Sequence, residues 1–323
     1  MLLPLLFIAV GLILLAVSAD RFVYGAAALA QGLGVAPVLV GLTIVAFGTS
    51  TPEILVSLLA GLQDAPGLAV GNAIGSNIAN LGLVLGITAL IAPVVAGRGL
   101  VRRELPLMLL VTLGVLLLLL DGRLTRPEGL VMLAGLVALV FWMVRAARGQ
   151  GADSDSTTGP EPGTPPAAAP AGLPAALAWV TGSLIVLLAS SQALVLGATE
   201  LAGQLGVSEL MIGLTLVAIG TSLPELATSV AAARRGQTAM ALGNIVGSNL
   251  FNLLAVLAVP ALVAPLTLEP GVLGRDYPVM LALTVAVLVA VRLGGGHIRR
   301  WHGGLLLLGF SGYLVSLAIT APA

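Results

Sequence analysis

The chain contains no cysteine and few charged side chains. Without cysteine it has no disulfide, no thiolate metal site and no cysteine nucleophile. Charged residues make up 9% of the 323 positions against 58% for hydrophobic residues, which excludes an ordinary soluble domain and indicates a polytopic membrane protein. The formal net charge is zero, so bulk electrostatics give no reason to expect nucleic acid or an acidic partner.

The apolar runs predict an all-α polytopic membrane protein with ten transmembrane helices. Each helix needs about 20 predominantly apolar residues to cross a bilayer. The N-terminal run lacks a positively charged start, which favours a first membrane helix over a cleaved signal peptide. The expected spans lie near residues 2–31, 37–62, 67–93, 104–120, 127–146, 174–203, 209–233, 239–263, 277–293 and 302–320.

The arginines predict the orientation of these spans, because cytoplasmic loops concentrate basic residues. With the N-terminus outside, the inside loops hold ten of the fourteen arginines: Arg98, Arg102, Arg103, Arg145, Arg148, Arg234, Arg235, Arg292, Arg299 and Arg300. We therefore expect a multi-pass protein of the plasma (inner) membrane with both termini outside. Residues 149–173 are rich in Pro, Gly, Ala and Ser and are expected to form a cytoplasmic linker.

Two long motifs occur twice. GLTIVAFGTSTPEILVSL at 41–58 shares eleven of eighteen positions with GLTLVAIGTSLPELATSV at 213–230, and GNAIGSNIANLGLVLG at 71–86 matches GNIVGSNLFNLLAVLA at 243–258. Both pairs are 172 residues apart and five expected spans separate them, so the two copies enter the membrane in opposite directions. The pattern predicts two inverted five-helix repeats, 1–148 and 174–323, a construction common in secondary transporters.

The first motif combines a helix break with an acid. Pro52 has no N–H, so the carbonyl of Gly48 loses its helical partner and becomes available to a cation. Thr49 and Glu53 are four residues apart and share one helix face. Hydroxyl, carbonyl and carboxylate oxygens are the ligands that hard cations prefer. A purely structural kink would explain the proline, but not the costly acid.

The second copy repeats this arrangement with Pro224, Gly220, Thr221 and Glu225. One helical turn spacing also relates Asn72, Ser76 and Asn80, with a matching stripe at Asn244, Ser248 and Asn252. For Asn72 and Asn244 we favour hydrogen bonding between helices. Ser76, Asn80, Ser248 and Asn252 are better ligand candidates, because their helices directly follow the two glutamate helices.

Three other charges leave alternatives open. Asp20 and Arg21 are adjacent in the first expected span, and either help ion access or form a buried structural pair. Glu200 in the sixth span either lines an entry path or lies near the membrane interface. No Ser/His/Asp or metal-histidine spacing appears, so an intramembrane enzyme has little support.

The blocks GTSTPE, GNAIGSNIAN, GTSLPE and GNIVGSNLFN resemble the signature repeats of the calcium/cation antiporter superfamily, most closely its prokaryotic sodium/calcium exchangers. The resemblance implies that the second and seventh helices lie at the protein centre and supply most ion ligands. Together with Asn252 from the polar stripe, the expected metal-binding residues are Ala46, Thr49, Ser50, Glu53, Ser76, Asn80, Ala218, Thr221, Ser222, Glu225 and Ser248.

Both Asn80 and Asn252 are neutral, so Glu53 and Glu225 supply the central formal charge of −2, which balances one Ca²⁺ or two Na⁺. The resemblance implies an exchange of three Na⁺ for one Ca²⁺. We predict an alternating-access Ca²⁺/Na⁺ antiporter, not an enzyme and without cofactor, a monomer whose partners are inorganic cations and the lipid bilayer. The alternatives are a proton/calcium antiporter using the same carboxylates, a membrane-embedded enzyme or scaffold, and, less suited to inverted repeats, a passive channel.

Overall fold

The computed structural model describes residues 2–149, 172–205, 218–269 and 271–320, and these residues are predominantly helical. Short π-helical turns, labelled η, interrupt several helices. The helices of the first half are α1 Leu2–Leu33, α2 Pro37–Val40, η1 Gly41–Val45, α3 Ala46–Thr49, α4 Thr51–Leu62, α5 Pro66–Ala79, η2 Asn80–Val84, α6 Leu85–Ile91, η3 Leu100–Glu104, α7 Leu105–Leu119 and α8 Arg126–Gly149. Those of the second half are α9 Leu173–Gln204, α11 Ala218–Thr221, α12 Leu223–Arg234, α13 Thr238–Phe251, η6 Asn252–Val256, α14 Ala258–Val263, η7 Val272–Asp276, α15 Tyr277–Leu293 and α16 Arg300–Thr320.

Seven described helices are long and apolar enough to cross a membrane, and an eighth span results if the pair 37–49 and 51–62, bent by 42°, counts as one. The prediction of an all-helical polytopic fold is therefore confirmed. The two remaining expected spans are not among these helices. Helix α7 has 15 residues and continues from η3, whose Arg102, Arg103 and Glu104 place three charges at its start. Residues 209–217 of the segment 209–233 lie outside the described part of the chain.

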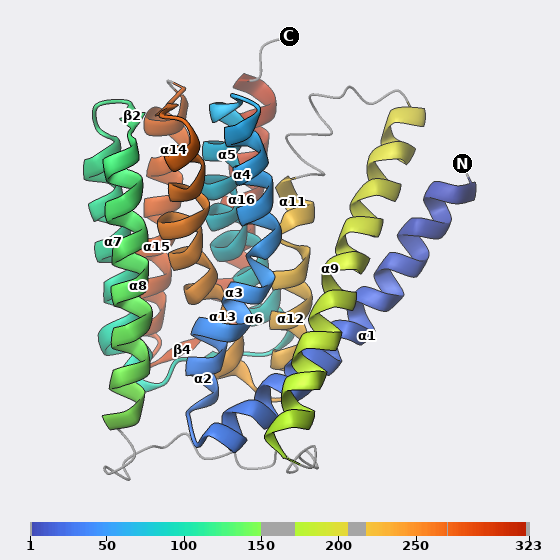
Figure 1. Cartoon of the computed structure of the whole chain (residues 1–323). Coiled ribbons are helices and arrows are strands. Elements are labelled where there is room, and N and C mark those ends of the chain that lie inside the picture. Colours follow the sequence, from blue (N-terminus) through green and yellow to red (C-terminus); the bar gives the residue numbers. More distant parts are fainter. Residues whose placement is uncertain (1, 150–171, 206–217, 270, 321–323) are drawn as a thin grey trace.

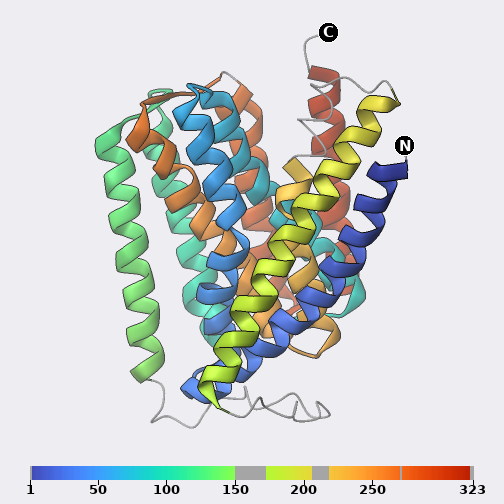
Figure 2. The ribbon, with the colours of Figure 1, turned by 45° about the vertical axis from the view of Figure 1, so that its right-hand side comes forward.

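The bundle has a buried centre and an exposed flank. The spans formed by α5 with α6 and by α13 with α14 are mostly buried, whereas only 28% of the α1 and α9 spans is buried. Helices α1 and α9 pack against each other along their lengths and form a tilted pair at one side of the bundle, while α7 and α8 stand at the other (Figures 1 and 2). Hydrophobic burial and the site described below therefore lie between these flanks.

Two short strand pairs cover opposite ends of the bundle (Figure 1). Strand β1 (Val94–Val95) pairs with β4 (His297–Ile298), and β2 (Arg123–Leu124) pairs with β3 (Leu266–Thr267), both antiparallel. Strands β1 and β3 begin 172 residues apart, and so do the turns η2 and η6 and the turns η3 and η7. Each pair thus joins a strand from one half of the chain to a strand from the other.

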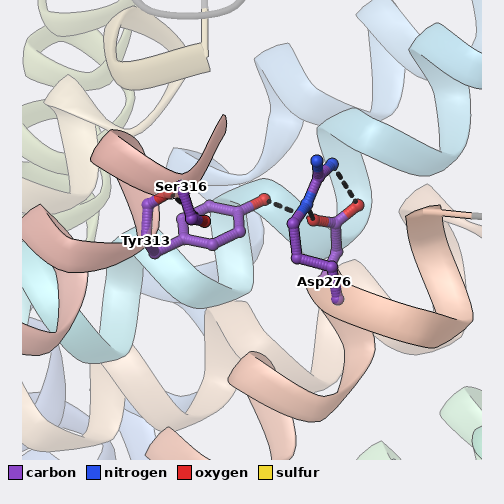
Figure 3. Close-up of polar contacts among 4 residues, drawn as sticks. Asp276, Tyr313 and Ser316 are labelled. Atoms are coloured by element: carbon purple, nitrogen blue, oxygen red, sulfur yellow. Dashed lines mark hydrogen bonds and ion pairs between the residues drawn. The ribbon is translucent and has the colours of Figure 1, made fainter. Parts of the chain in front are cut away.

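Oppositely charged neighbours pair at the ends of η3 and η7: Arg103 with Glu104, and Arg275 with Asp276. At the end of η7, Arg275 Nε lies 2.7 Å from Asp276 Oδ1, and the Tyr313 hydroxyl donates a 3.1 Å hydrogen bond to the same oxygen (Figure 3). Tyr313 in turn accepts a hydrogen bond from Ser316 at its carbonyl. This network fastens α16 to the start of α15, where an unpaired carboxylate would be costly.

Glycines let two central helices touch through their backbones. A Cβ atom at Gly247 of α13 would overlap the carbonyl oxygen of Leu42 in η1 and lie 2.6 Å from Ala46 Cβ. A Cβ at Gly243, one turn earlier, would lie 2.5 Å from the carbonyl oxygen of Val38. Small residues are the usual means of such close approach between membrane helices.

We expect Gly247→Ala to lower the stability of the protein, because the methyl group must push α13 away from η1. Overpacking of this kind costs about 1–3 kcal/mol. Thermal unfolding in detergent micelles measures the effect. Gly114→Ala is the matched control, since a Cβ at Gly114 in α7 meets no atom within 4 Å. Equal melting temperatures for the two variants would contradict the close contact.

Candidate functional site

The two repeated glutamates lie in the first turns of the helices that follow each break. Helix α3 ends at Thr49 and α11 ends at Thr221, and the serines that follow them, Ser50 and Ser222, have ψ of 3° instead of a helical value. Glu53 is the third residue of α4 and Glu225 the third of α12. A helix N-terminus carries partial positive charge, so the break favours a carboxylate at this point.

Both carboxylates are buried and close together. The exposed fraction is 1% for Glu53 and 0% for Glu225, and the two side chains are near enough to interact electrostatically. The described residues contain no group of three or more acidic or histidine side chains that could hold a metal ion. The acidic part of the site is therefore this pair of carboxylates, taken from helices far apart in the chain.

Neutral polar groups lie beside the carboxylates or on the segments that pack against their helices, and many have no hydrogen-bond partner among the described residues. The hydroxyl of Ser50 donates a 3.3 Å hydrogen bond to Glu225 Oε1, while Ser248 lies beside this carboxylate without hydrogen-bond geometry. The buried side-chain atoms in this region that lack a partner are both carboxylate oxygens of Glu53, Oε2 of Glu225, the hydroxyls of Ser76, Ser222 and Ser248, and the amide groups of Asn80 and Asn252.

Such a concentration of unpaired buried oxygens is unusual, because most buried polar atoms in proteins are hydrogen-bonded. Carboxylate, hydroxyl and amide oxygens form a donor set suited to hard cations such as Ca²⁺. The candidate ligands Glu53, Glu225, Ser76, Asn80 and Ser248 all belong to this set, as does Asn252. The arrangement can neutralise its own negative charge by binding cations.

Asn72 and Asn244 have a different role from the other stripe residues, as expected. The Asn72 amide donates to the Glu53 carbonyl at 2.9 Å and to Ser57 Oγ at 2.8 Å. The Asn244 amide donates to Thr228 at 3.1 Å and to a neighbouring serine, and its Oδ1 lies 3.3 Å from the Thr49 hydroxyl. These bonds fasten each glutamate helix to the helix that follows it.

The alanine carbonyls differ between the two halves. The Ala46 carbonyl accepts the Ser50 N–H at 2.9 Å and lies 3.4 Å from the Thr49 hydroxyl. In the second half the Ser222 N–H donates instead to the Ile219 carbonyl at 3.1 Å. Helix α11 begins at Ala218 and ends at Thr221. Thr221 interacts with other groups of the protein.

The carbonyl freed by Pro224 has a partner that the sequence interpretation missed. Ser191 of α9 donates a 3.1 Å hydrogen bond from its Oγ to the Gly220 carbonyl. This carbonyl therefore has a side-chain donor within the protein, whether or not a cation binds. The adjacent serines at 190 and 191, which follow the apolar stretch 184–189, were the available signal.

Asp20, Arg21 and Glu200, the three charges with open alternatives, each have defined neighbours. Both carboxylate oxygens of Asp20 bind Arg235, with Nε–Oδ1 at 2.6 Å, so the expected alternative of a structural pair between Asp20 and Arg21 is wrong. Arg21 lies over the Trp179 ring instead. Glu200 is exposed and accepts a 3.3 Å hydrogen bond from Gln204.

Known proteins resemble this chain over its whole length. The model of the sodium/calcium exchanger protein family matches residues 3–145 and 175–318, two ranges that begin 172 positions apart. A putative antiporter CaxA of Alkalimonas amylolytica is 47% identical over 97% of this chain and 98% of its own length. The sodium/calcium exchanger MaX1 of Methanosarcina acetivorans is 31% identical over 97% of both chains.

A solved structure shares the fold. The sodium-calcium exchanger NCX_Mj, soaked with Na⁺ and Ca²⁺, has a TM-score of 0.84 and 32% identity, with the whole of both chains covered. A structure of the same exchanger soaked with neither ion has the same TM-score at 34% identity. The inner membrane protein YrbG of Escherichia coli is 41% identical over this entire chain and 99% of its own length.

We expect Ser191→Ala to destabilise the protein by about 1–2 kcal/mol, because the buried Gly220 carbonyl loses its donor. Thermal unfolding in detergent micelles tests this. Ser190→Ala is the control, since the Ser190 hydroxyl bonds only to Val186 within its own helix. Identical losses in the two variants would show that the bond from α9 to the helix break contributes nothing.

Proposed function

Because this chain belongs to the sodium/calcium exchanger protein family, we propose that it exchanges Ca²⁺ for Na⁺ across the membrane by alternating access. The observation that carries the proposal is the pair of neighbouring, fully buried carboxylates, Glu53 and Glu225, three of whose four oxygens have no hydrogen-bond partner in the described residues. Two buried negative charges are costly without a counter-ion. A transported cation supplies it.

The proposed ion ligands come from both halves of the chain. The unpaired oxygens support Glu53, Ser76, Asn80, Ser222, Glu225, Ser248 and Asn252. Ser50 is supported as a ligand by its hydrogen bond to Glu225, and Thr49 by its burial beside the site. Ala46, Ala218 and Thr221 are included because they occupy the repeated motif, and their contribution rests on that motif alone.

We further propose that the protein is built from two inverted five-helix repeats, 1–148 and 174–323, joined by a cytoplasmic linker at 149–173, with ten spans and both termini outside. Matching strands and π-helical turns 172 residues apart support this, as does the match of one family model to each half. The strand pairs at opposite ends of the bundle are what a two-fold axis in the membrane plane would produce.

Coupling follows from competition for the same oxygens. The carboxylate pair carries a formal charge of −2, which one Ca²⁺ or two Na⁺ neutralise, and the neutralised site can be carried past a low-dielectric barrier at less cost than a charged one. A third Na⁺ would add an uncompensated positive charge. Asn80 and Asn252 supply oxygen ligands without changing this balance.

Replacement of either carboxylate by its amide should abolish exchange. We expect Glu53→Gln and Glu225→Gln each to reduce Ca²⁺ flux into proteoliposomes by about 100-fold or more, because the bound cation loses one of its two balancing carboxylates, and removing one partner of a buried ion pair is costly on that scale. Glu200→Gln is the control, because this glutamate is exposed at the end of α9. Near-normal flux in both site variants would refute the assignment of the ion site.

The second candidate is proton/calcium exchange, since the same carboxylates can release Ca²⁺ by taking up protons. We expect Ca²⁺ accumulation in vesicles to follow an opposing Na⁺ gradient at equal pH on both sides. A pH gradient without Na⁺ should drive none. The reverse result, with accumulation driven only by the pH gradient and lost in Glu53→Gln, would assign the proton as the counter-ion of the same site.

A further inference from the structure

A groove runs along the exposed side of the α1–α9 pair. It consists of two adjoining hollows of about 210 and 320 Å³, which share Leu14 of α1 and Val186 of α9 in their walls. Along α1 the groove extends from Phe7 to Arg21, which at 1.5 Å per residue is a length of about 21 Å. One leaflet is half of a hydrocarbon core about 30 Å thick. Because the helix pair is tilted, a groove of this length is comparable with one leaflet.

Glycine and other small residues leave the space for this groove. Gly182 of α9 lines the larger hollow, is exposed, and has no atom within 4 Å of the position that a Cβ would occupy. The remaining walls are apolar or small, with Ala178, Ala189 and Ser183 on the same helix. An apolar chain can therefore lie between the two helices without displacing a side chain.

One end of the groove is positively charged. Arg21 is exposed in its wall, with its guanidinium 5.8 Å from the centre of the Trp179 ring. The nearest acid in sequence, Asp20, gives both of its oxygens to Arg235. Tyr24 packs edge-on against Trp179 with ring centres 6.3 Å apart, which helps to hold the indole at this end.

We propose that this groove binds an anionic phospholipid, with an acyl chain in the two hollows and the phosphate at Arg21. A cation on a membrane-facing helix is costly unless it reaches water or a phosphate. The groove is apolar along its length and positive at one end, which is the complement of an anionic phospholipid. A lipid with no net charge fills the hollows equally well but gains less from the arginine. The proposal does not depend on which ions the protein exchanges.

Trp179 offers a direct probe, because it lines the groove and the chain has three tryptophans. Replacing Trp142 and Trp301 with Phe leaves Trp179 as the fluorophore in the full-length protein. The protein is reconstituted into vesicles in which phosphatidylglycerol or phosphatidylcholine carries brominated acyl chains, which quench nearby indole fluorescence. We expect half-maximal quenching at a mole fraction of phosphatidylglycerol about fivefold lower than that of phosphatidylcholine. This is the gain in affinity that one arginine near an anionic head group provides.

Two variants separate the head group from the chain. Arg21→Gln should remove the preference for phosphatidylglycerol and leave quenching by both lipids, with Arg145→Gln at the exposed end of α8 as control. Gly182→Leu fills the groove and should weaken quenching by both lipids at least threefold. Gly135→Leu is its control, because Gly135 in α8 is also exposed and has no atom near its Cβ position.

Equal quenching by the two lipids in the unsubstituted protein would overturn the proposal and identify only surrounding bulk lipid. Unchanged quenching in Gly182→Leu would also overturn it, as would a preference that survives Arg21→Gln. Protection of Trp179 by dimerisation, seen as quenching that falls as protein concentration rises, would assign the groove to a second copy of the chain. Ca²⁺ flux into the same vesicles verifies that each variant is folded.

Discussion

The burial of two carboxylates beside each other is the constraint on which the rest of this structure depends. Neither Glu53 nor Glu225 has a basic partner in the described residues, and both lie inside a bundle that is mostly apolar. The fold holds them by ending one helix and starting another at the same place in each half, so that each acid sits in a first turn. The neutral oxygens around them supply what a cation would need.

Close helix contact makes this placement possible. Gly247 and Gly243 bring α13 against η1 at backbone distance, and the amides of Asn72 and Asn244 tie each glutamate helix to its successor. Ser191 reaches from the flanking helix α9 to the break itself. Backbone contact and hydrogen bonds therefore hold the centre together, whereas α1 and α9 have exposed sides with a groove along them.

Much of the site was accessible from the repeated motif. The proline break followed by an acid predicted that Glu53 and Glu225 lie just beyond a helix break, and each does lie in the first turn of the helix that follows one. The expected helix-linking role of Asn72 agrees with its bonds to Glu53 and Ser57. The ion pair of Asp20 with Arg235 was not predictable, because 215 residues separate the partners. The donor from Ser191 to Gly220 was missed for the same reason: nothing local in α9 indicates which carbonyl it faces.

The sequence by itself determined the membrane class, the repeat spacing and the identity of the paired acids, because composition and periodic motifs are local properties that a single chain displays directly. Only the tertiary structure decided which oxygens remain without partners, which carbonyl Ser191 binds and that α1 and α9 leave a groove with Arg21 at one end. These features depend on the relative placement of helices far apart in the chain. That placement is determined by packing across the whole bundle, not by any one segment.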